Sequence, residues 1–179
     1  MSKEKIGFFG GSFNPVTNAH IKLIKSVIIK EKLDKVYFVP MGNLYEKQGL
    51  IDFKHRKNMI KLAIENEEKI DILDFLNDIN HKMYAIDTFK LIDEKFKNAD
   101  RYFIMGTDNY DKITNWKDAE ALKDNYKYIV LDRKTESDTK EISSTIVRNK
   151  IINKESIEDL VPNKVKSYIY KNNLYNSNW

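Results

Sequence analysis

A glycine-rich segment near the start of the chain groups residue types that suit phosphate chemistry. Gly10 and Gly11 follow an apolar stretch and are followed by Ser12 and Phe13. Glycines carry no side chain, so they let the backbone approach a ligand closely. We therefore expect the backbone at these two glycines to lie close to a ligand.

Thr17 and His20 come shortly afterwards, at the start of a helix expected over residues 18–30. Residues three apart share one face of a helix, and a helix N-terminus offers N–H groups and a positive dipole end to a phosphate. His20 could add a donor or a positive charge to the same anion. A tight turn followed by an ordinary helical His is the plainer interpretation, but the convergence of glycines, hydroxyl and imidazole favours phosphate binding. The segment contains neither the dinucleotide-binding fingerprint nor a P-loop.

A second candidate segment covers residues 142–148. Ser143 is a good helix N-cap, while Ser144 and Thr145 place hydroxyl and N–H groups where anions bind. Arg148, about one turn further on, can reach the same region. Alone, this pattern fits a capped surface helix equally well. Together, the two segments predict two helix starts that hold one triphosphate between them.

Alternating short apolar stretches and amphipathic patterns indicate the elements that position these residues. We predict an α/β fold, a Rossmann-like open parallel sheet of about five strands flanked by helices, as a single domain over 1–179. Ligands bind beyond the carboxyl ends of such strands, so segments 10–20, 40–49, 106–116 and 132 onward are expected near the site. The expected strands are 5–10, 35–39, 69–73, 101–105 and 126–131; the expected helices are 18–30, 54–65, 83–96, 143–150 and 163–171; residues 41–51 are expected to form a loop.

Composition narrows the class of protein. The 179 residues suit one domain, and the complete lack of Cys excludes disulfides and Cys-based metal sites. No signal-peptide pattern or membrane-spanning stretch occurs, so we expect a cytoplasmic protein without membrane contact. The net charge of +4 comes without a dense basic block. Nucleic-acid binding would rest on charge alone and is not expected.

The two motifs, in this order, resemble the nucleotidyltransferase superfamily named for its His-x-Gly-His signature. The subgroup that the chain most resembles is the bacterial nicotinate mononucleotide adenylyltransferases, over nearly all of its length. Gly106 and Asp108, followed by Trp116, are similar to that subgroup's Gly-x-Asp…Trp segment. The resemblance implies that Trp116 stacks on a pyridine ring and that Asp108 lies near a ribose.

Further positions follow from the same resemblance. Tyr84 and Thr88 match the start of the family's central helix, Arg133 stands where an Arg packs near adenine, and Lys47 keeps the positive charge of a loop that meets phosphate. The chain also departs from the family pattern. Thr17 and Ala19 replace the first His and the Gly of the signature, residues 44–47 replace Pro-Pro-His-Lys, and Ala85 replaces a Thr associated with the nicotinate carboxylate.

The resemblance implies transfer of AMP from ATP to nicotinate mononucleotide, giving deamido-NAD and pyrophosphate in NAD biosynthesis. It also implies that the cleft for ATP and the acceptor is lined by Gly10, Gly11, Ser12 and Phe13. His20, Thr17 and Arg148 would hold the phosphates, and Mg²⁺ would arrive with ATP rather than at a protein metal site. Two alternatives stay open. The acceptor could be nicotinamide mononucleotide or phosphopantetheine, or the chain could bind nucleotides without catalysis. The sequence carries no sign of the oligomeric state.

Overall fold

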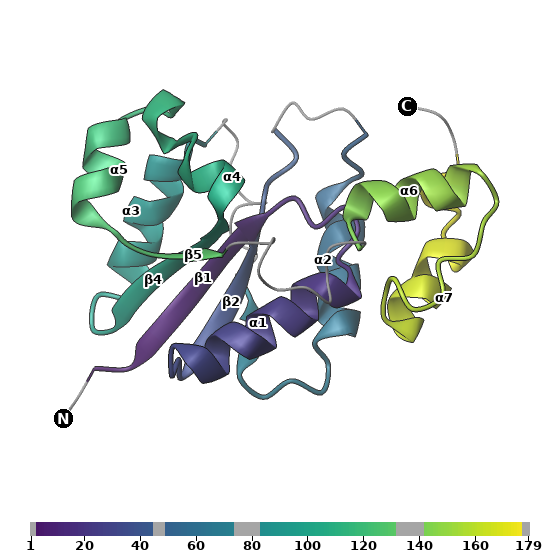
Figure 1. The fold of residues 1–179 in the computed structure, drawn as a ribbon, viewed down its shortest axis with the longest axis horizontal. Helices are drawn as coiled ribbons and strands as arrows, with labels where there is room; N and C mark the ends of the chain where they lie inside the picture. Colours follow the sequence, from purple (N-terminus) through teal and green to yellow (C-terminus); the bar gives the residue numbers. More distant parts are fainter. Residues whose placement is uncertain (1–2, 45–48, 74–82, 132–141, 177–179) are drawn as a thin grey trace.

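A five-stranded sheet forms the centre of the protein in the computed structural model (Figure 1), which describes residues 3–44, 49–73, 83–131 and 142–176. The strands lie in the order β3-β2-β1-β4-β5, and every neighbouring pair is parallel. The predicted α/β fold with an open parallel sheet is confirmed. The strands are β1 (Lys5–Gly11), β2 (Lys35–Pro40), β3 (Ile70–Ile72), β4 (Asp100–Gly106) and β5 (Lys127–Leu131).

Helices cover both faces of this sheet. In Figure 1, α3 and α5 lie to the left of the sheet, and α1, α2, α6 and α7 lie to its right. The helices are α1 (Asn18–Lys30), α2 (Phe53–Ala63), α3 (Ala85–Lys95), α4 (Thr107–Tyr110), α5 (Ala119–Asn125), α6 (Ser144–Ile152), α7 (Asn163–Lys171) and the short 3₁₀ helix η2 (Ile113–Asn115). Among the described residues, no helix has the length and apolar character needed to cross a bilayer.

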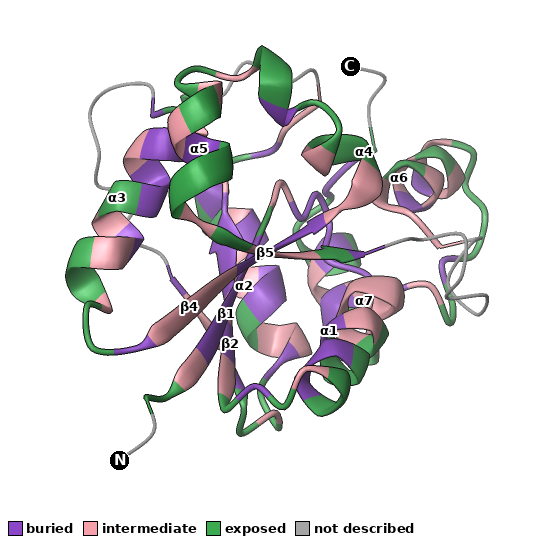
Figure 2. Cartoon of the chain, turned by 60° about the vertical axis from the view of Figure 1, so that its left-hand side comes forward, coloured by how far each residue is buried: buried purple, intermediate pink, exposed green. Residues whose placement is uncertain are grey.

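Two apolar clusters hold the layers together, one on each face of the sheet. Successive side chains of a strand point to opposite faces. Phe8 accordingly belongs to the cluster beneath α3 and α5, and Phe9 to the cluster beneath α1, α2, α6 and α7. Figure 2 shows the buried residues gathered along the sheet and on the inward faces of the helices. Both faces of β1 are therefore packed, which keeps its carboxyl end in a fixed place.

Several element ends are shifted by one or two residues from the sequence-based expectation, and three short helices were not expected. β1 continues through Gly10 and Gly11, which pair with Val39 and Pro40, instead of ending there. The helix expected from residue 83 begins at Ala85. The short helices α4, η2 and α5 were not predicted, because three to seven residues are too few to show a helical period.

Candidate active site

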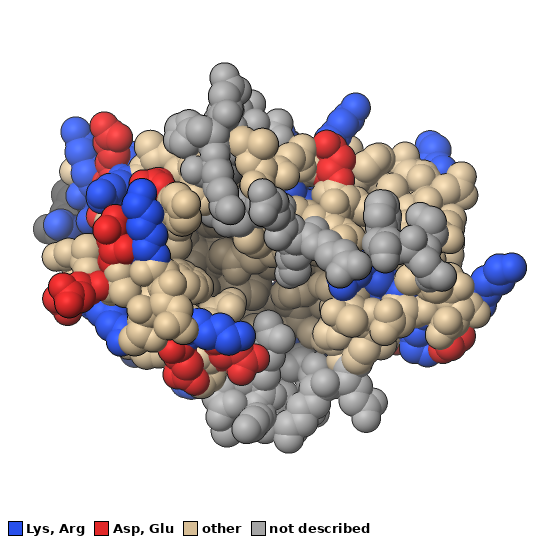
Figure 3. Space-filling view, turned by 90° about the horizontal axis from the view of Figure 1, so that it is seen from above, with Lys and Arg blue, Asp and Glu red and all other residues tan. Residues whose placement is uncertain are grey.

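The ends of four strands bring the predicted ligand segments to one edge of the sheet. Parallel pairing places Gly11 beside Pro40 and Gly106 beside Leu131, and β1 also pairs in parallel with β4. Seen from above this edge, the molecular surface is hollowed near its centre (Figure 3). Open parallel sheets bind ligands at such an edge. The segments predicted to contact ligand thus begin side by side around one hollow.

Thr17 and His20 form a reciprocal capping pair where α1 begins. The Thr17 side chain accepts a hydrogen bond from the His20 backbone N–H at 3.4 Å, and the Thr17 backbone N–H donates to His20 Nδ1 at 3.0 Å. Since Nδ1 accepts from an amide, the proton of the neutral imidazole lies on Nε2. The cap therefore orients His20 as an Nε2–H donor.

Thr17 takes a different place from the one expected. Its side chain is fully buried, and its hydroxyl lies 2.8 Å from His20 Nδ1. The buried hydroxyl thus positions His20 from behind. Direct contact of Thr17 with a triphosphate stays a prediction.

The side chain of Phe13 also lies behind His20. Its ring is buried and packs edge-on against His20, with 5.4 Å between the ring centroids. A Cβ added to Gly11 would lie only 2.9 Å from the Phe13 ring, whereas one added to Gly10 would meet nothing within 4 Å. The two glycines therefore differ: Gly11 makes room for Phe13, and the space beside Gly10 is open to a ligand.

The helix start predicted near the C-terminus contacts the segment after β1 directly. Ser144 Oγ donates to the carbonyl of Pro15 at 2.7 Å, and Arg148 Nη1 donates to the carbonyl of Asn14, also at 2.7 Å. In Figure 1 the start of α6 lies beside this segment, which we call the β1–α1 loop (residues 12–17). The two motifs are thus in direct contact, although the hydrogen-bonded residues are 129 and 134 positions apart in sequence. That they hold one triphosphate between them stays a prediction.

The remaining residues of the second motif shape the start of α6. Ser143 caps the helix, because its Oγ accepts from the Ile146 N–H at 3.2 Å, as predicted. Thr145 is exposed, and its Oγ1 accepts from Arg148 Nη2 at 3.3 Å. The Arg148 guanidinium is thus held in one orientation by the β1–α1 loop and by its own helix.

The segment after β4 presents the predicted Gly-x-Asp residues. Gly106 is the N-cap of α4, and Asp108 is exposed in the first turn of that helix. Thr107 Oγ1 donates to the carbonyl of Leu131 at 3.2 Å, which fastens the ends of β4 and β5 together. Asp108 therefore stands at the carboxyl edge with its carboxylate accessible, as a ribose contact would require.

Tyr84 and Trp116 flank the same edge, on the side covered by α3. Tyr84 is exposed and precedes α3, while Trp116 is partly buried against the cluster that α3 and α5 share. Lys117 Nζ lies 4.7 Å from the centre of the Tyr84 ring. Thr88 is buried, and its hydroxyl donates to the Tyr84 carbonyl at 3.4 Å. Thr88 therefore braces the first turn of α3, and its contact with substrate stays a prediction.

Two predicted residues, Lys47 and Arg133, lie outside the described residues. Within the described part of the chain, no group of three His, Asp or Glu side chains is placed to hold a metal ion.

Sequence reasoning missed three residues that hold the β1–α1 loop. Arg56 of α2 is fully buried and donates from Nη1 to the Ser12 carbonyl at 3.0 Å. The Tyr175 hydroxyl donates to Asn14 Oδ1 at 3.0 Å, and Asn14 Nδ2 donates to the Gly49 carbonyl at 2.7 Å. An Arg in an amphipathic helix and a Tyr near the C-terminus carry no local signal of such contacts.

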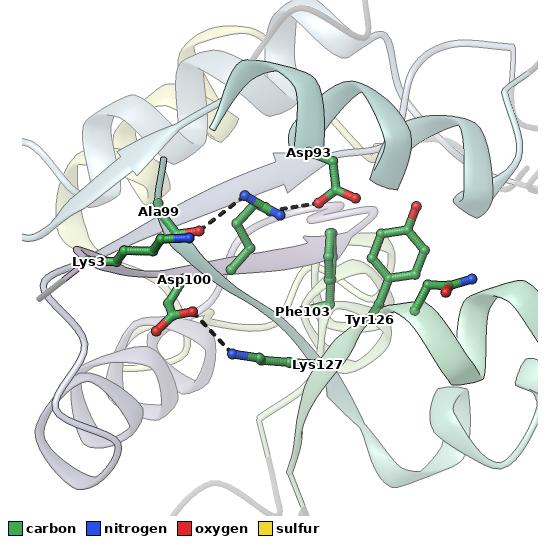
Figure 4. Close-up of a pocket in the computed structure, with 9 residues that line it drawn as sticks. Lys3, Asp93, Ala99, Asp100, Phe103, Tyr126 and Lys127 are labelled. Carbon is green, nitrogen blue, oxygen red and sulfur yellow. Dashed lines mark hydrogen bonds and ion pairs between the residues drawn. The ribbon is translucent and has the colours of Figure 1, made fainter. Parts of the chain in front are cut away.

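The opposite edge of the sheet holds a pocket of a different kind (Figure 4). Its volume is about 160 Å³, below the ~300–1,000 Å³ usual for small-molecule sites. Arg101 Nε is paired with Asp93 at 2.7 Å, and Lys127 with Asp100 at 3.1 Å. Arg101 and Lys127 are thus paired with carboxylates, and Lys3 also lines the pocket.

Comparison with known proteins agrees with this geometry. The model of the cytidylyltransferase-like family matches residues 8–150, which include the carboxyl ends of β1, β2, β4 and β5 and the start of α6. The chain belongs to the cytidylyltransferase-like family. It is therefore a nucleotidyltransferase, and the hollow at the carboxyl edge is its candidate active site.

Solved structures resemble this nucleotidyltransferase over almost its whole length. One is a Vibrio parahaemolyticus protein that carries the provisional name nicotinate-nucleotide adenylyltransferase, with a TM-score of 0.80, 21% identity and coverage of 98% of this chain and 97% of that one. Plasmodium falciparum nicotinic acid mononucleotide adenylyltransferase complexed with NaAD matches with a TM-score of 0.80, 25% identity and coverage of 98% of both chains. The same enzyme complexed with APC matches with a TM-score of 0.79, 24% identity and coverage of 98% of both chains. The sequence analysis named the bacterial enzymes of this subgroup. The similar structures come from a bacterium and a eukaryote, so they do not distinguish a bacterial origin.

Proposed function

We propose that this nucleotidyltransferase is a nicotinate-nucleotide adenylyltransferase. It transfers AMP from ATP to nicotinate mononucleotide, giving deamido-NAD and pyrophosphate, and we place the reaction in the cytoplasm. The observation that carries the proposal is the meeting of two helix starts at the β1–α1 loop, with His20 on α1 and Arg148 on α6. Two helix N-termini, one imidazole and one guanidinium together suit a polyphosphate.

The reaction needs alignment more than covalent help. A phosphate oxygen of the acceptor attacks the α-phosphorus of ATP, one P–O bond forms, the bond from the α-phosphorus to the bridging oxygen breaks, and pyrophosphate leaves. Negative charge builds up on the phosphate oxygens in the transition state. His20 donates from Nε2 to this charge, as its Nδ1 hydrogen bond dictates, and Arg148 adds a fixed positive charge.

Magnesium enters this scheme as part of the substrate. Mg²⁺ is bound mainly by the phosphates of ATP and by water, as is usual for nucleotide substrates. Asp108 is the acidic side chain at the carboxyl edge, and we assign it to the ribose of a bound nucleotide instead of to the ion.

The side chains beside α3 favour an acceptor with a flat ring and a carboxylate. Trp116 is partly exposed, so one part of its indole can stack on a pyridine ring. Lys117 follows it directly and lies over Tyr84. An ammonium in this position attracts the carboxylate of nicotinate, whereas the amide of nicotinamide carries no charge to pair with it. The complex of the Plasmodium enzyme with NaAD also supports this choice.

Pyrophosphate release tests the proposal. The purified protein is mixed with ATP and Mg²⁺ and offered nicotinate mononucleotide, nicotinamide mononucleotide or phosphopantetheine in separate reactions. We expect release with nicotinate mononucleotide at the highest kcat/KM. Preference for another acceptor would overturn the assignment of nicotinate mononucleotide as substrate but not the type of reaction. ATP binding without pyrophosphate release in any mixture would favour the non-catalytic alternative.

Substitutions at the acceptor side test the ring and the carboxylate separately. Trp116→Ala should raise the KM for the acceptor about 10-fold or more, because stacking on an aromatic contributes about 1–3 kcal/mol. Lys117→Gln should reduce the preference for the acid over the amide and leave the KM for ATP unchanged. Lys123→Gln on α5 is a matched control for the loss of one surface charge. A rise in the KM for ATP alone would place Trp116 outside the acceptor site.

A further inference from the structure

Arg56 stands out among the charged residues near the candidate site because no ligand can reach it. Its side chain is fully buried between α2 and the β1–α1 loop. Nε donates to the Ile51 carbonyl at 2.9 Å, and Nη1 donates to the Ser12 carbonyl at 3.0 Å. Both partners are neutral backbone groups. Arg56 thus joins two segments that lie 5 and 44 residues away from it in sequence.

The charge of Arg56 is not cancelled by a paired carboxylate. None of the ion pairs between described residues includes it, and its Nη2 has no hydrogen-bond partner there. The neighbouring Asp52 carboxylate is occupied by the Lys54 N–H and by Asn43. Burial lowers the pKa of Arg56 to about 10, so the guanidinium stays charged at neutral pH.

The contact with Ser12 also sets the direction of a peptide group. Arg56 is buried, so the Ser12 carbonyl that it binds points into the protein. In a planar trans peptide the following N–H points the opposite way. The N–H of Phe13 is therefore directed away from Arg56. Nearby, the Asn14 carbonyl is occupied by Arg148 and that of Pro15 by Ser144.

We propose that Arg56 is a positioning residue for phosphate binding: it holds the Ser12 carbonyl away from the cleft and supplies an unpaired positive charge beneath the β1–α1 loop. Carbonyl oxygens that faced the cleft would repel phosphate, whereas N–H groups attract it. A charge in the interior is screened less than one at the surface, so it still acts on an anion that it does not touch. The inference rests on the proposed function for the presence of a triphosphate at this loop.

The test compares Arg56→Met with Arg56→Lys, using ATP and adenosine as probes in calorimetry. Met removes the charge and both hydrogen bonds at similar volume, and Lys keeps the charge. For Arg56→Met we expect the Kd for ATP and the kcat each to worsen about 10- to 100-fold, because small misplacements of a site have effects of this size. The Kd for adenosine, which lacks phosphates, should change less than about twofold by the same reasoning. Arg56→Lys should recover most of the ATP affinity and less of the kcat.

Arg101→Met is the matched control, because Arg101 also donates to two backbone carbonyls but lies at the other edge of the sheet. It should leave both Kd values unchanged. Equal weakening of ATP and adenosine binding by Arg56→Met, or wild-type values for ATP, would overturn the inference. If the Arg56→Met variant does not fold, the Arg56→Lys variant becomes the test. A kcat and a Kd for ATP equal to those of wild type in Arg56→Lys would then overturn the inference. Failure of the wild-type protein to bind ATP would count instead against the proposed function.

Discussion

The two edges of the sheet use arginine in opposite ways. At the amino edge, Arg101 donates to two carbonyls and also pairs with Asp93 at 2.7 Å, so its charge is neutralised. At the carboxyl edge, Arg56 and Arg148 donate to carbonyls of the β1–α1 loop and pair with no carboxylate among the described residues. Hydrogen bonds of the same type thus brace both edges. The difference is that the guanidinium at the amino edge is paired with a carboxylate, whereas the two at the carboxyl edge keep their charge available to an anionic substrate.

The largest expected effect comes from removing the imidazole of His20, the proposed hydrogen-bond donor to phosphate at the carboxyl edge. His20→Ala should lower kcat about 10²- to 10³-fold, because one preorganised donor to transition-state charge has an effect of this size. Steady-state pyrophosphate release measures it. Thr17→Val keeps the backbone bond to Nδ1 and should lower kcat by a smaller factor. Turnover of His20→Ala within a few-fold of wild type would remove His20 from the reaction.

Alanine substitutions at the two glycines that end β1 should have different effects, one mainly on stability and the other on ATP binding. Gly11→Ala pushes a Cβ to 2.9 Å from the Phe13 ring, so it should lower the free energy of unfolding by about 1–3 kcal/mol and also reduce kcat through the displaced His20 ring. Gly10→Ala meets no protein atom and should leave stability unchanged while raising the KM for ATP. Thermal unfolding and initial rates measure both. An unchanged KM in Gly10→Ala would show that no ligand approaches that Cα.

At the amino edge, substitutions should change stability without changing turnover. Asp93→Asn removes the carboxylate from Arg101 and should lower the free energy of unfolding by about 1 kcal/mol, because both side chains are partly exposed. Urea denaturation measures this loss. The kcat and both KM values should equal those of wild type. A fall in turnover would contradict the separation of the two edges.

The smallest effect should come from pH at the pair formed by Asp100 and Lys127. The Lys127 ammonium lowers the pKa of Asp100 below 3.8, and Asp100 raises the pKa of Lys127 above 10.5. The pair therefore contributes stability between these values, and loses it as pH falls through the lowered carboxyl pKa or rises through the raised ammonium pKa. Thermal midpoints of wild type and Asp100→Asn should differ slightly at pH 7 and converge near pH 2. A difference that persists there, or that is insensitive to salt, would contradict an exposed ion pair.

Helix periods and caps made much of the fold predictable. The bounds of α1 and α7 match the sequence-based prediction, because apolar residues recur at helical spacing in both, and Thr17 is a good cap for α1. Both phosphate motifs were also recognisable, since hydroxyl, imidazole and guanidinium groups stand where helices begin. Spacing, however, shows which residues share a face and not how deeply they lie. The burial of Thr17, Phe13 and Thr88 was therefore unpredictable.

The supports of the β1–α1 loop were beyond sequence reasoning for another reason. Arg56 and Tyr175 bind a backbone carbonyl and an Asn side chain, 44 and 161 positions away. A carbonyl exists at every residue, so nothing in the sequence marks the one that is used. Such partners are fixed only when the sheet brings the segments together.

The contact of Tyr175 with Asn14 has a consequence for the order in which the chain folds during its synthesis. The Tyr175 ring is buried, and its hydroxyl reaches the loop that follows the first strand. Translation reaches Tyr175 only after the five strands of the sheet, because the fifth strand ends at Leu131. A nascent chain can therefore complete its sheet while the loop still lacks this support. Proteolytic removal of Tyr175 would return a folded molecule to the same incomplete state.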